Sequence, residues 1–336
     1  MTLAARLEPF RGRPSLVAIA TMNLITGFVA LAVLAPLSFG ADAAAYRRGA
    51  LAVAAGGYDK DFLYTPLAAL LATPLTWMPE FAAALLMTAI GIAALTIGVI
   101  VETRGLASID RVLCFIAAIG FLPVVNELLL GQITLLFAAA LWPIVRWPDR
   151  RRNGIAFGIA MALAPKPALL PVLLWMLLRR RQALIGVVIA GALTLGLGVL
   201  VMGVDAHQHW LAVLQRAGSV NRLGNVSLWT FGLTGGAILL SMPLLVSYIV
   251  SLWGSEDSGL IASLLAGLIF APYTLVYSAT ILLLVVRNAD RLMPWRTRLL
   301  ALVANPLMIP LTLLWFMAAH IATGFATPPL IRIRRR

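Results

Sequence analysis

Long apolar runs separated by short charged segments make up most of this chain. The first run covers residues 15–40, and later runs cover residues 80–101, 184–202 and 237–253. Because a helix needs about 20 apolar residues to cross a bilayer, we interpret each run as one crossing. The first run is too long for the apolar core of a signal peptide, which favours a membrane span there.

Other apolar runs are interrupted by proline. Residues 153–178 have an arginine triplet on either side and Pro165–Lys166–Pro167 at their centre. Proline prevents a regular helix at that point, and a single crossing would put one arginine cluster outside. We therefore predict two short helices with Lys166 at the outer turn. The same form recurs in residues 260–286 and 299–325.

Between the run of residues 80–101 and that of residues 153–178, we predict two more short spans at residues 111–125 and 133–145. A polar break at Asn126–Glu127 and Gly131–Gln132 separates them. Together the runs predict an all-α polytopic membrane protein, in which residues 1–336 form a single transmembrane domain of about 12 short helices. Both chain ends are then on the same, cytoplasmic side.

Two polar stretches are predicted to lie on the outer side. Residues 41–79 carry several charges, and helical spacing of apolar residues around Tyr46 predicts a short interfacial helix. A second interfacial helix follows, interrupted by prolines. Residues 204–232 form the other outer loop.

The composition excludes several classes of protein. Apolar residues make up 61% of the chain and charged residues only 12%, with a mean hydropathy of +0.96. A water-soluble fold of this size would lack polar surface, so a soluble enzyme, a disordered chain and a collagen-like fibre are excluded. The single cysteine excludes a disulfide framework and cysteine-based metal sites.

The net charge of +13 is distributed in short arginine clusters between apolar runs. Such clusters mark cytoplasmic loops and favour anionic lipid headgroups as partners. No single basic face results, so nucleic acid is not an expected partner. The chain is expected in a plasma (inner) membrane, with its unusual polar residues on the outer face.

Two charged residues on that face are the strongest candidates for catalytic or binding residues. Lys166 is flanked by prolines at membrane depth, where a cation usually has a partner or a wet cavity. It either extends to the surface as an interfacial lysine or binds a phosphate or carboxylate. Asp42 follows the first span and is either a solvated carboxylate at a helix end or a general base.

The outer loop of residues 204–232 mixes histidines and arginines with tryptophan, which is common at membrane interfaces. His207 and His209 are too few ligands for a zinc site. The sequence also contains no phosphate-binding P-loop, no Gly-x-Ser-x-Gly and no His-Glu-x-x-His motif. An ATP-driven machine and a membrane metalloprotease are therefore not expected.

A series of motifs runs through most of the chain in a recognisable order. It begins with Asp42-x-x-x-Tyr46 and the small-residue helix after it, and continues through Tyr64-Thr-Pro66, Gly131-Gln132 and Lys166-Pro167. Further matches are Asn225-Val-Ser227 and Pro272-Tyr273. In this series the chain resembles glycosyltransferase family 87, the polyprenyl-phosphate-mannose-dependent mannosyltransferases of the GT-C class.

The resemblance implies a GT-C-like membrane enzyme that moves a hexose, by expectation mannose, from a polyprenyl-phosphate sugar to a lipid or glycan acceptor with inversion. It implies Asp42 as the general base. Candidates for binding the donor phosphate are Lys166, Arg47, Arg48, Arg222, His207 and His209. Candidates for binding sugar or acceptor are Tyr46, Tyr64, Gln132 and Asn225. No cofactor is expected, and a metal requirement is left open.

Two other functions are compatible with the residue pattern. A transporter or flippase for a lipid or small solute would carry polar residues through the full depth and on the inner side. A structural or assembly protein would not bring Asp42 and Lys166 together. The concentration of polar residues on one face favours the enzyme.

Overall fold

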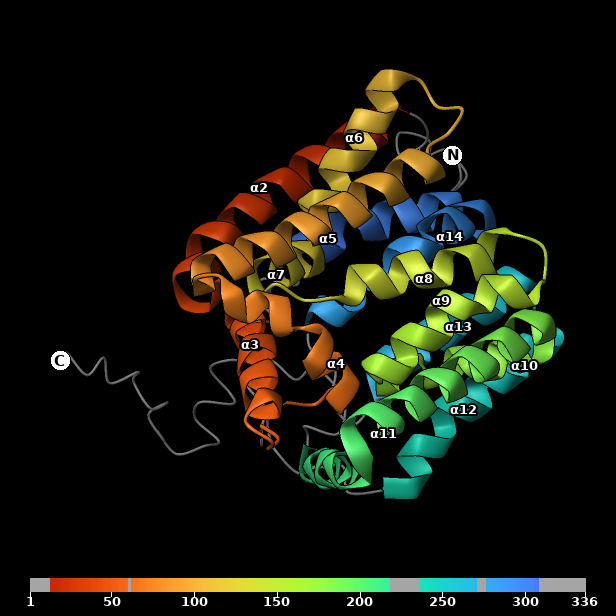
Figure 1. Cartoon of the computed structure of the whole chain (residues 1–336). Helices are drawn as coiled ribbons and strands as arrows, with labels where there is room; N and C mark the ends of the chain where they lie inside the picture. Colours follow the sequence, from red (N-terminus) through yellow and green to blue (C-terminus); the bar gives the residue numbers. More distant parts are fainter. Residues whose placement is uncertain (1–12, 60–61, 218–235, 271–275, 308–336) are drawn as a thin grey trace, which may run out of the picture.

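The computed structural model describes residues 13–59, 62–217, 236–270 and 276–307, which form helices and no strand (Figure 1). The all-α prediction is therefore confirmed for these residues. Among them, three helices are long and apolar enough to cross a membrane: α2 (Arg13–Ser38), α5 (Glu80–Glu102) and the first part of α11 (Arg181–Ala217). A fourth candidate is the bent pair α6 (Ser108–Ile119) and α7 (Leu122–Leu130). The count of about 12 spans stays a prediction.

The long helices turn most of their apolar side chains outward. Only 17% of the most apolar window of α5 and 22% of that of α11 is buried. Phe28, Ile97 and Leu200 are exposed examples on the three helices. Apolar surface of this extent on a helical protein is the surface that lipid covers.

The predicted span of residues 111–125 is instead bent, because α6 and α7 meet at an angle of 65°. Gly120 packs against the backbone of Asn23, and the buried amide of Asn305 accepts the Leu122 N–H (2.6 Å) and donates to the Gly120 carbonyl (3.0 Å). These contacts satisfy backbone groups that the bend releases. The predicted polar break at Asn126–Glu127 is wrong at this point, because both residues lie within α7 and only Gly131–Gln132 interrupts the helices.

A sharp turn at Gly40 connects α2 to α3 (Ala41–Ala54), the short helix predicted around Tyr46. Gly40 has φ 72° and donates its N–H to the Leu129 carbonyl (2.7 Å). The left-handed conformation suits glycine, which lacks a Cβ. The second helix of this region is present as α4 (Pro66–Leu71) and the 3₁₀ turn η2 (Thr73–Trp77).

Two of the three proline-interrupted runs form helix pairs, as predicted. α9 (Arg151–Leu163) ends before Lys166, and η3 (Pro167–Leu169) and α10 (Leu170–Arg179) follow it. Residues 260–286 are divided between α13 (Glu256–Phe270) and η5 (Val276–Val285), which continues into α14 (Val286–Leu292). In the third predicted pair, residues 299–307 are helical and the rest lies outside the described residues.

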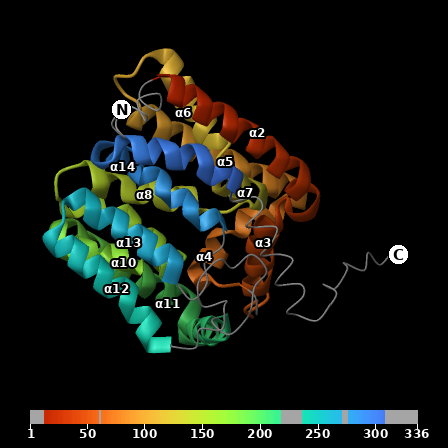
Figure 2. The same cartoon turned by 180° about the vertical axis from the view of Figure 1, so that it is seen from behind.

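These short helices form the main core together with α8 (Thr134–Arg146) and the start of α11, while α12 (Gly236–Trp253) lies beside α10 and α13 (Figure 2). Phe137, Phe157 and Trp175 are the largest side chains fully buried there. The elements α8, α10, α13 and η5 lie side by side, so that their ends gather at two opposite ends of the core. One end carries Gln132 and Lys166, and the other carries arginines that follow or end these helices.

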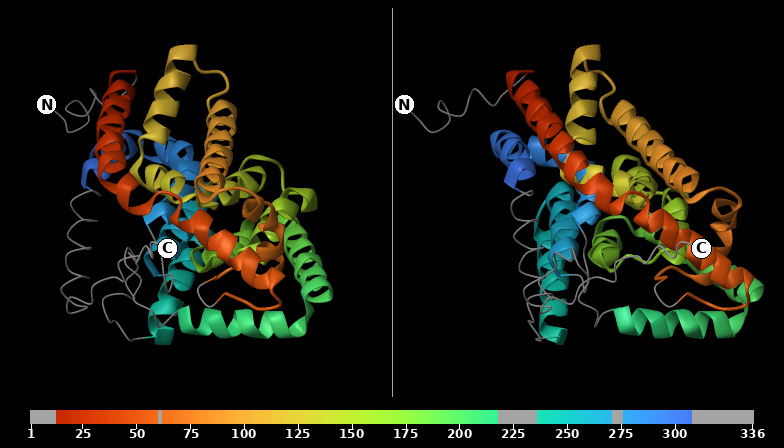
Figure 3. Two further views of the ribbon diagram at one scale, coloured as in Figure 1. Left: turned by 60° about the vertical axis from the view of Figure 1, so that its left-hand side comes forward. Right: turned by 90° about the vertical axis from the view of Figure 1, so that its left-hand side faces the viewer.

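The stretch predicted as an outer loop, residues 204–232, is helical as far as Ala217. Gly203 has φ 79° and ψ 165° and breaks α11 into two segments. Figure 3 shows the second segment running across the lower edge of the molecule, at a steep angle to the first. Residues 218–232 of the predicted loop lie outside the described residues.

Helices α9 and α11 approach one another closely through glycine. A Cβ placed on Gly186 would lie 1.9 Å from the Arg151 carbonyl oxygen, and one on Gly154 would lie 1.9 Å from that of Ala183. Gly158, four residues after Gly154, faces Val187 in the same way. Small residues at this spacing let helix backbones pack tightly in a membrane protein.

We expect Gly186→Val to destabilise the protein by about 1–3 kcal/mol or more, because backbone atoms must move to make room. Gly196→Val is the matched control, since Gly196 lies in the same helix and a Cβ there would meet nothing within 4 Å. Thermal unfolding in detergent, followed by tryptophan fluorescence, measures both. Equal stability of the two variants would contradict the close packing.

Candidate active site

A cavity lies where α3, the start of α8, the Lys166 turn and the start of η5 come together. Its polar lining includes Asp42, Gln132, Lys166 and Tyr277, and its apolar lining includes Leu268. The volume is about 90 Å³, below the roughly 300 Å³ that small-molecule pockets usually enclose. A sugar ring therefore needs the lining side chains to move apart.

Gln132 connects the polar groups of this cavity. Its Nε2 donates to Asp42 Oδ2 (2.6 Å) and to the Tyr277 hydroxyl (3.2 Å). Its Oε1 accepts the hydroxyl protons of Tyr46 and Tyr64, each at 3.2 Å. The amide is 5% exposed, so it is held in a single orientation by four partners.

Asp42 occupies the first turn of α3. The helix dipole favours a carboxylate there, because unpaired backbone N–H groups point toward it. Its side chain is half-buried and lines the cavity. The hydrogen bond from Gln132 orients the carboxylate in this cavity, as a base requires.

Lys166 lies in the connection between α9 and η3 and lines the same cavity. Its Nζ sits 5.3 Å from the ring centre of Tyr277 and 5.5 Å from that of Phe137. Burial lowers the pKa of Lys166, and electrostatic attraction to Glu127 and to Asp42 acts in the opposite direction. Asp42 and Lys166 therefore line one and the same cavity.

The Lys166 turn is supported from behind by α13. A Cβ on Gly267 would lie 1.8 Å from the Ala168 carbonyl oxygen, so glycine alone allows this approach. The two prolines flanking Lys166 restrict the turn further, because proline fixes φ. The ammonium is thus placed by a rigid backbone.

Aromatic side chains form one wall of the cavity. The rings of Tyr46 and Tyr64 stack with centres 5.4 Å apart, and Phe62 meets both edge-on. Burial raises the pKa of Tyr46 well above its ordinary value, and Tyr64 and Asp42 add to this effect. Tyr46 therefore stays protonated at neutral pH and acts as a hydrogen-bond donor.

Glu127 is a residue near the site that the sequence analysis did not select. It is fully buried in α7, and its Oε1 accepts the Leu135 N–H at the start of α8. Its attraction to Lys166 adds a second carboxylate beside the ammonium. A carboxylate within an apolar run is itself a signal of function, but it was interpreted as part of a polar break.

Tyr277 is the second functional candidate that the sequence analysis missed. It lies in the apolar run of η5, and no motif distinguishes it from other tyrosines. Only the fold brings its hydroxyl to Gln132 and its ring to Lys166.

The two arginines of α3 do not line the cavity. Arg47 donates to the Leu75 carbonyl (2.9 Å) and pairs with Glu80 (3.2 Å), so it joins α3 to η2 and α5. Arg48 is exposed elsewhere on the helix. The prediction that these two residues bind the donor phosphate therefore has no support in this geometry, because helical periodicity turns them away from Asp42.

The histidines are also outside the cavity lining. His207 is buried beyond the bend of α11, where its Nδ1 lies 2.9 Å from the Gly203 carbonyl oxygen. Its neighbour Trp210 donates to the Leu63 carbonyl (3.0 Å), which attaches this helix segment to the loop bearing Tyr64. His209 is exposed. Arg222 and Asn225 lie outside the described residues.

No group of three histidine, cysteine, aspartate or glutamate side chains within the described ranges is arranged to hold a metal ion. The chemistry of this cavity is that of one carboxylate, one ammonium and a set of neutral hydrogen-bonding groups. Such a set can remove a proton from a hydroxyl and stabilise a developing negative charge.

Comparison with known proteins gives one match. The model of glycosyltransferase family 87 matches residues 62–310, which is well over half of the 336 residues. The matched region includes Tyr64, Gln132, Lys166 and Tyr277, and begins after Asp42. No curated protein and no solved structure matches the chain.

Proposed function

The chain belongs to glycosyltransferase family 87 and is a membrane glycosyltransferase, and from this premise we propose that it transfers a hexose from a polyprenyl-phosphate sugar to a lipid or glycan acceptor. Mannose is the proposed hexose, on the basis of the family resemblance. The observation that carries the proposal is the convergence of Asp42, Gln132 and Lys166 on one cavity.

In the proposed reaction, Asp42 removes the proton from the acceptor hydroxyl. The acceptor oxygen then attacks the anomeric carbon from the face opposite the phosphate. The bond between that carbon and the phosphate oxygen breaks, the configuration inverts, and polyprenyl phosphate leaves with the bonding electrons. The proton remains on Asp42 until it passes to water.

Lys166 is proposed to stabilise the phosphate as it leaves. The ammonium is held between aromatic rings by a rigid turn, so it needs little reorganisation when negative charge develops. Gln132 and the hydroxyls of Tyr46 and Tyr64 are proposed to bind sugar hydroxyls and to orient Asp42.

The position of the arginines supports a cavity on the outer face of a plasma membrane. Arg146, Arg180 and Arg287 lie at the opposite ends of the elements whose other ends carry Gln132, Lys166 and Tyr277. Arginine-rich ends face the cytoplasm. The cavity with Asp42 is then on the outer side.

The direct test offers purified protein in lipid nanodiscs a panel of polyprenyl-phosphate sugars and nucleotide sugars, with lipid extracts as acceptors. We expect release of polyprenyl phosphate from one sugar donor and growth of one acceptor by the mass of a hexose, both read by mass spectrometry. Transfer from a nucleotide sugar alone would exclude the proposed donor.

We expect Gln132→Met to lower kcat by about 10–100-fold with little change in the KM for the donor, because Asp42 loses the donor that orients it. Gln182→Met is the matched control, since Gln182 lies on α11 and contacts only the exposed Arg151 through its side chain. An unchanged kcat in a folded Gln132→Met variant would show that Asp42 needs no positioning by this amide.

A further inference from the structure

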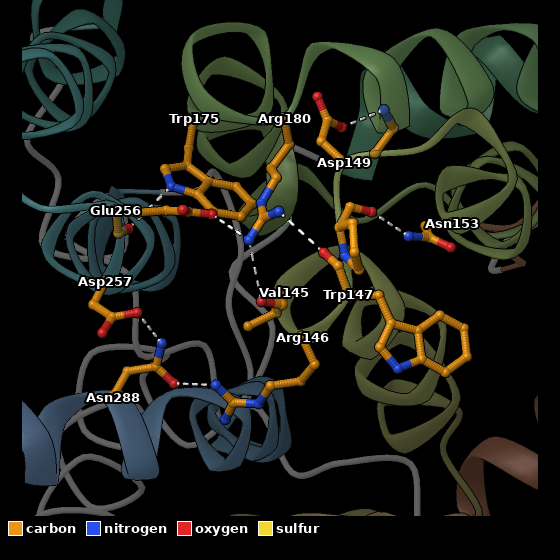
Figure 4. Close-up of polar contacts among 12 residues, drawn as sticks. Val145, Arg146, Trp147, Asp149, Asn153, Trp175, Arg180, Glu256, Asp257 and Asn288 are labelled. Atoms are coloured by element: carbon orange, nitrogen blue, oxygen red, sulfur yellow. Dashed lines mark hydrogen bonds and ion pairs between the residues drawn. The ribbon is translucent and has the colours of Figure 1, made fainter.

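A second cavity of about 400 Å³ lies at the arginine-rich end of the same helices. It is bounded by the ends of α5, α8 and α10 and by the starts of α13 and α14. Figure 4 shows Arg146 directed toward Asn288 and Arg180 directed toward Glu256, each pair from separate elements. The volume is within the range of small-molecule sites.

Ion pairs fix the walls of this cavity. Arg146 pairs with Glu102, and its two Nη atoms donate to Asn288 (2.5 Å) and to the Leu284 carbonyl (2.9 Å). Arg180 pairs with Glu256 and donates to the Trp147 carbonyl (3.0 Å) (Figure 4). These two guanidinium groups are mostly buried, so they hold a constant geometry.

The lining carries more positive than negative charge. Five arginines face three carboxylates, those of Glu102, Glu256 and Asp257. Arg146 and Arg180 are neutralised by Glu102 and Glu256, whereas Arg287 lies 3.6 Å from a Glu102 oxygen that Arg146 does not use.

Arg104 and Arg291 complete the set. Within the part of the chain that the structure describes, neither has a hydrogen bond or ion pair. Both are exposed at the cavity, so their planar donor groups can turn toward a ligand. A guanidinium group matches a phosphate by two parallel hydrogen bonds.

We propose that this cavity binds a phosphate group, either from the headgroup of an anionic phospholipid or from a soluble phosphorylated molecule. Arg104, Arg287 and Arg291 contact the phosphate, while the pairs of Arg146 and Arg180 hold the walls apart. Basic pockets between helices at a cytoplasmic membrane face suit lipid phosphates in this way. Trp142 and Trp147 line the same cavity, and tryptophan is enriched at that depth.

The test uses the full-length protein in a neutral detergent, with phosphatidylglycerol as the probe and native mass spectrometry as the readout. We expect bound phosphatidylglycerol in preference to phosphatidylcholine. The double variant Arg104→Gln/Arg291→Gln should weaken binding by about tenfold or more. Arg150→Gln/Arg152→Gln is the control, since these exposed arginines lie outside the cavity and remove the same charge.

Inorganic phosphate, compared with chloride at equal ionic strength, distinguishes the two sources. Displacement of the lipid by millimolar phosphate indicates a site for soluble phosphorylated molecules, and retention of the lipid indicates a lipid site. Equal loss of binding in both double variants, or no binding by the unmodified protein, would overturn the proposal. Should the glutamine variant unfold at a lower temperature than the control, Arg104→Lys/Arg291→Lys supplies the test, with an expected loss of about threefold.

This phosphate site is independent of sugar transfer, because no residue lines both cavities. Lipid binding is measured without a sugar donor. Failure of either proposal therefore leaves the other in place.

Discussion

Replacing Asp42 by asparagine is expected to lower the rate of sugar transfer by about 10²–10⁴-fold at saturating substrate, since a general base contributes a factor of that size. Asparagine keeps the shape of the side chain and can still accept the Gln132 N–H, so the cavity stays intact. It cannot take the proton of the acceptor. Turnover is measured with the donor that the sugar panel identifies, by release of polyprenyl phosphate.

Asp205→Asn is the matched control for this experiment. Asp205 is an exposed carboxylate on the second segment of α11 and does not line the cavity. We expect that variant to retain the full rate. An Asp42→Asn variant that folds and transfers sugar at the unmodified rate would remove the proposed base, while membership of the family would be unaffected.

Replacing Lys166 by methionine is expected to reduce kcat by about 10²–10³-fold, the usual cost of removing a preorganised group that stabilises developing charge. Methionine retains much of the apolar stem of the lysine side chain and removes the ammonium that lies over the rings of Phe137 and Tyr277. This change removes both the attraction of the ammonium to Asp42 and Glu127 and the larger, opposing cost of burying it, so thermal unfolding is measured beside kcat.

Lys166→Arg tests the shape of the cation. It keeps the charge, but its larger planar group does not fit the same position, so we expect an intermediate kcat. Arg48→Met is the control for loss of an exposed positive charge on the same side of the fold. A folded Lys166→Met variant with unchanged kcat would show that the ammonium does not act on the leaving phosphate.

The helix pair around Lys166 could be predicted from the sequence because its cause is local. Two prolines and two flanking arginine triplets determine the turn without information from the rest of the chain. The short helix carrying Asp42 was predictable for the same reason, since its apolar spacing and the glycine before it are contiguous. Local signals therefore located the two principal charges.

The orientation of Arg47 could not be predicted in this way. Because Arg47 is close to Asp42 in the sequence, the two residues were expected to share a site. The helix instead turns Arg47 to another face, where it pairs with Glu80. The bend between α6 and α7 has a cause still farther away, because Asn305 supplies its hydrogen bonds from the end of the described chain. Contacts between distant segments leave no local pattern.

Gln132 illustrates both cases. The sequence indicated a polar residue after a glycine between apolar runs, and hence a place where substrate could bind. Its link to Asp42, Tyr46, Tyr64 and Tyr277 depends on three separate elements meeting α8. Residue type could be predicted from the chain, but the network required the fold.

The length of α8 constrains how lipids reach this protein. At 1.5 Å per residue its 13 residues rise about 20 Å, and the two cavities lie at its ends. The hydrocarbon layer of a bilayer is about 30 Å thick. The two cavities are therefore too close together for each to lie in a headgroup layer of an undistorted membrane. If both proposed ligands are lipids, either the bilayer becomes thinner around the protein or one headgroup is drawn inward to the depth of the acyl chains.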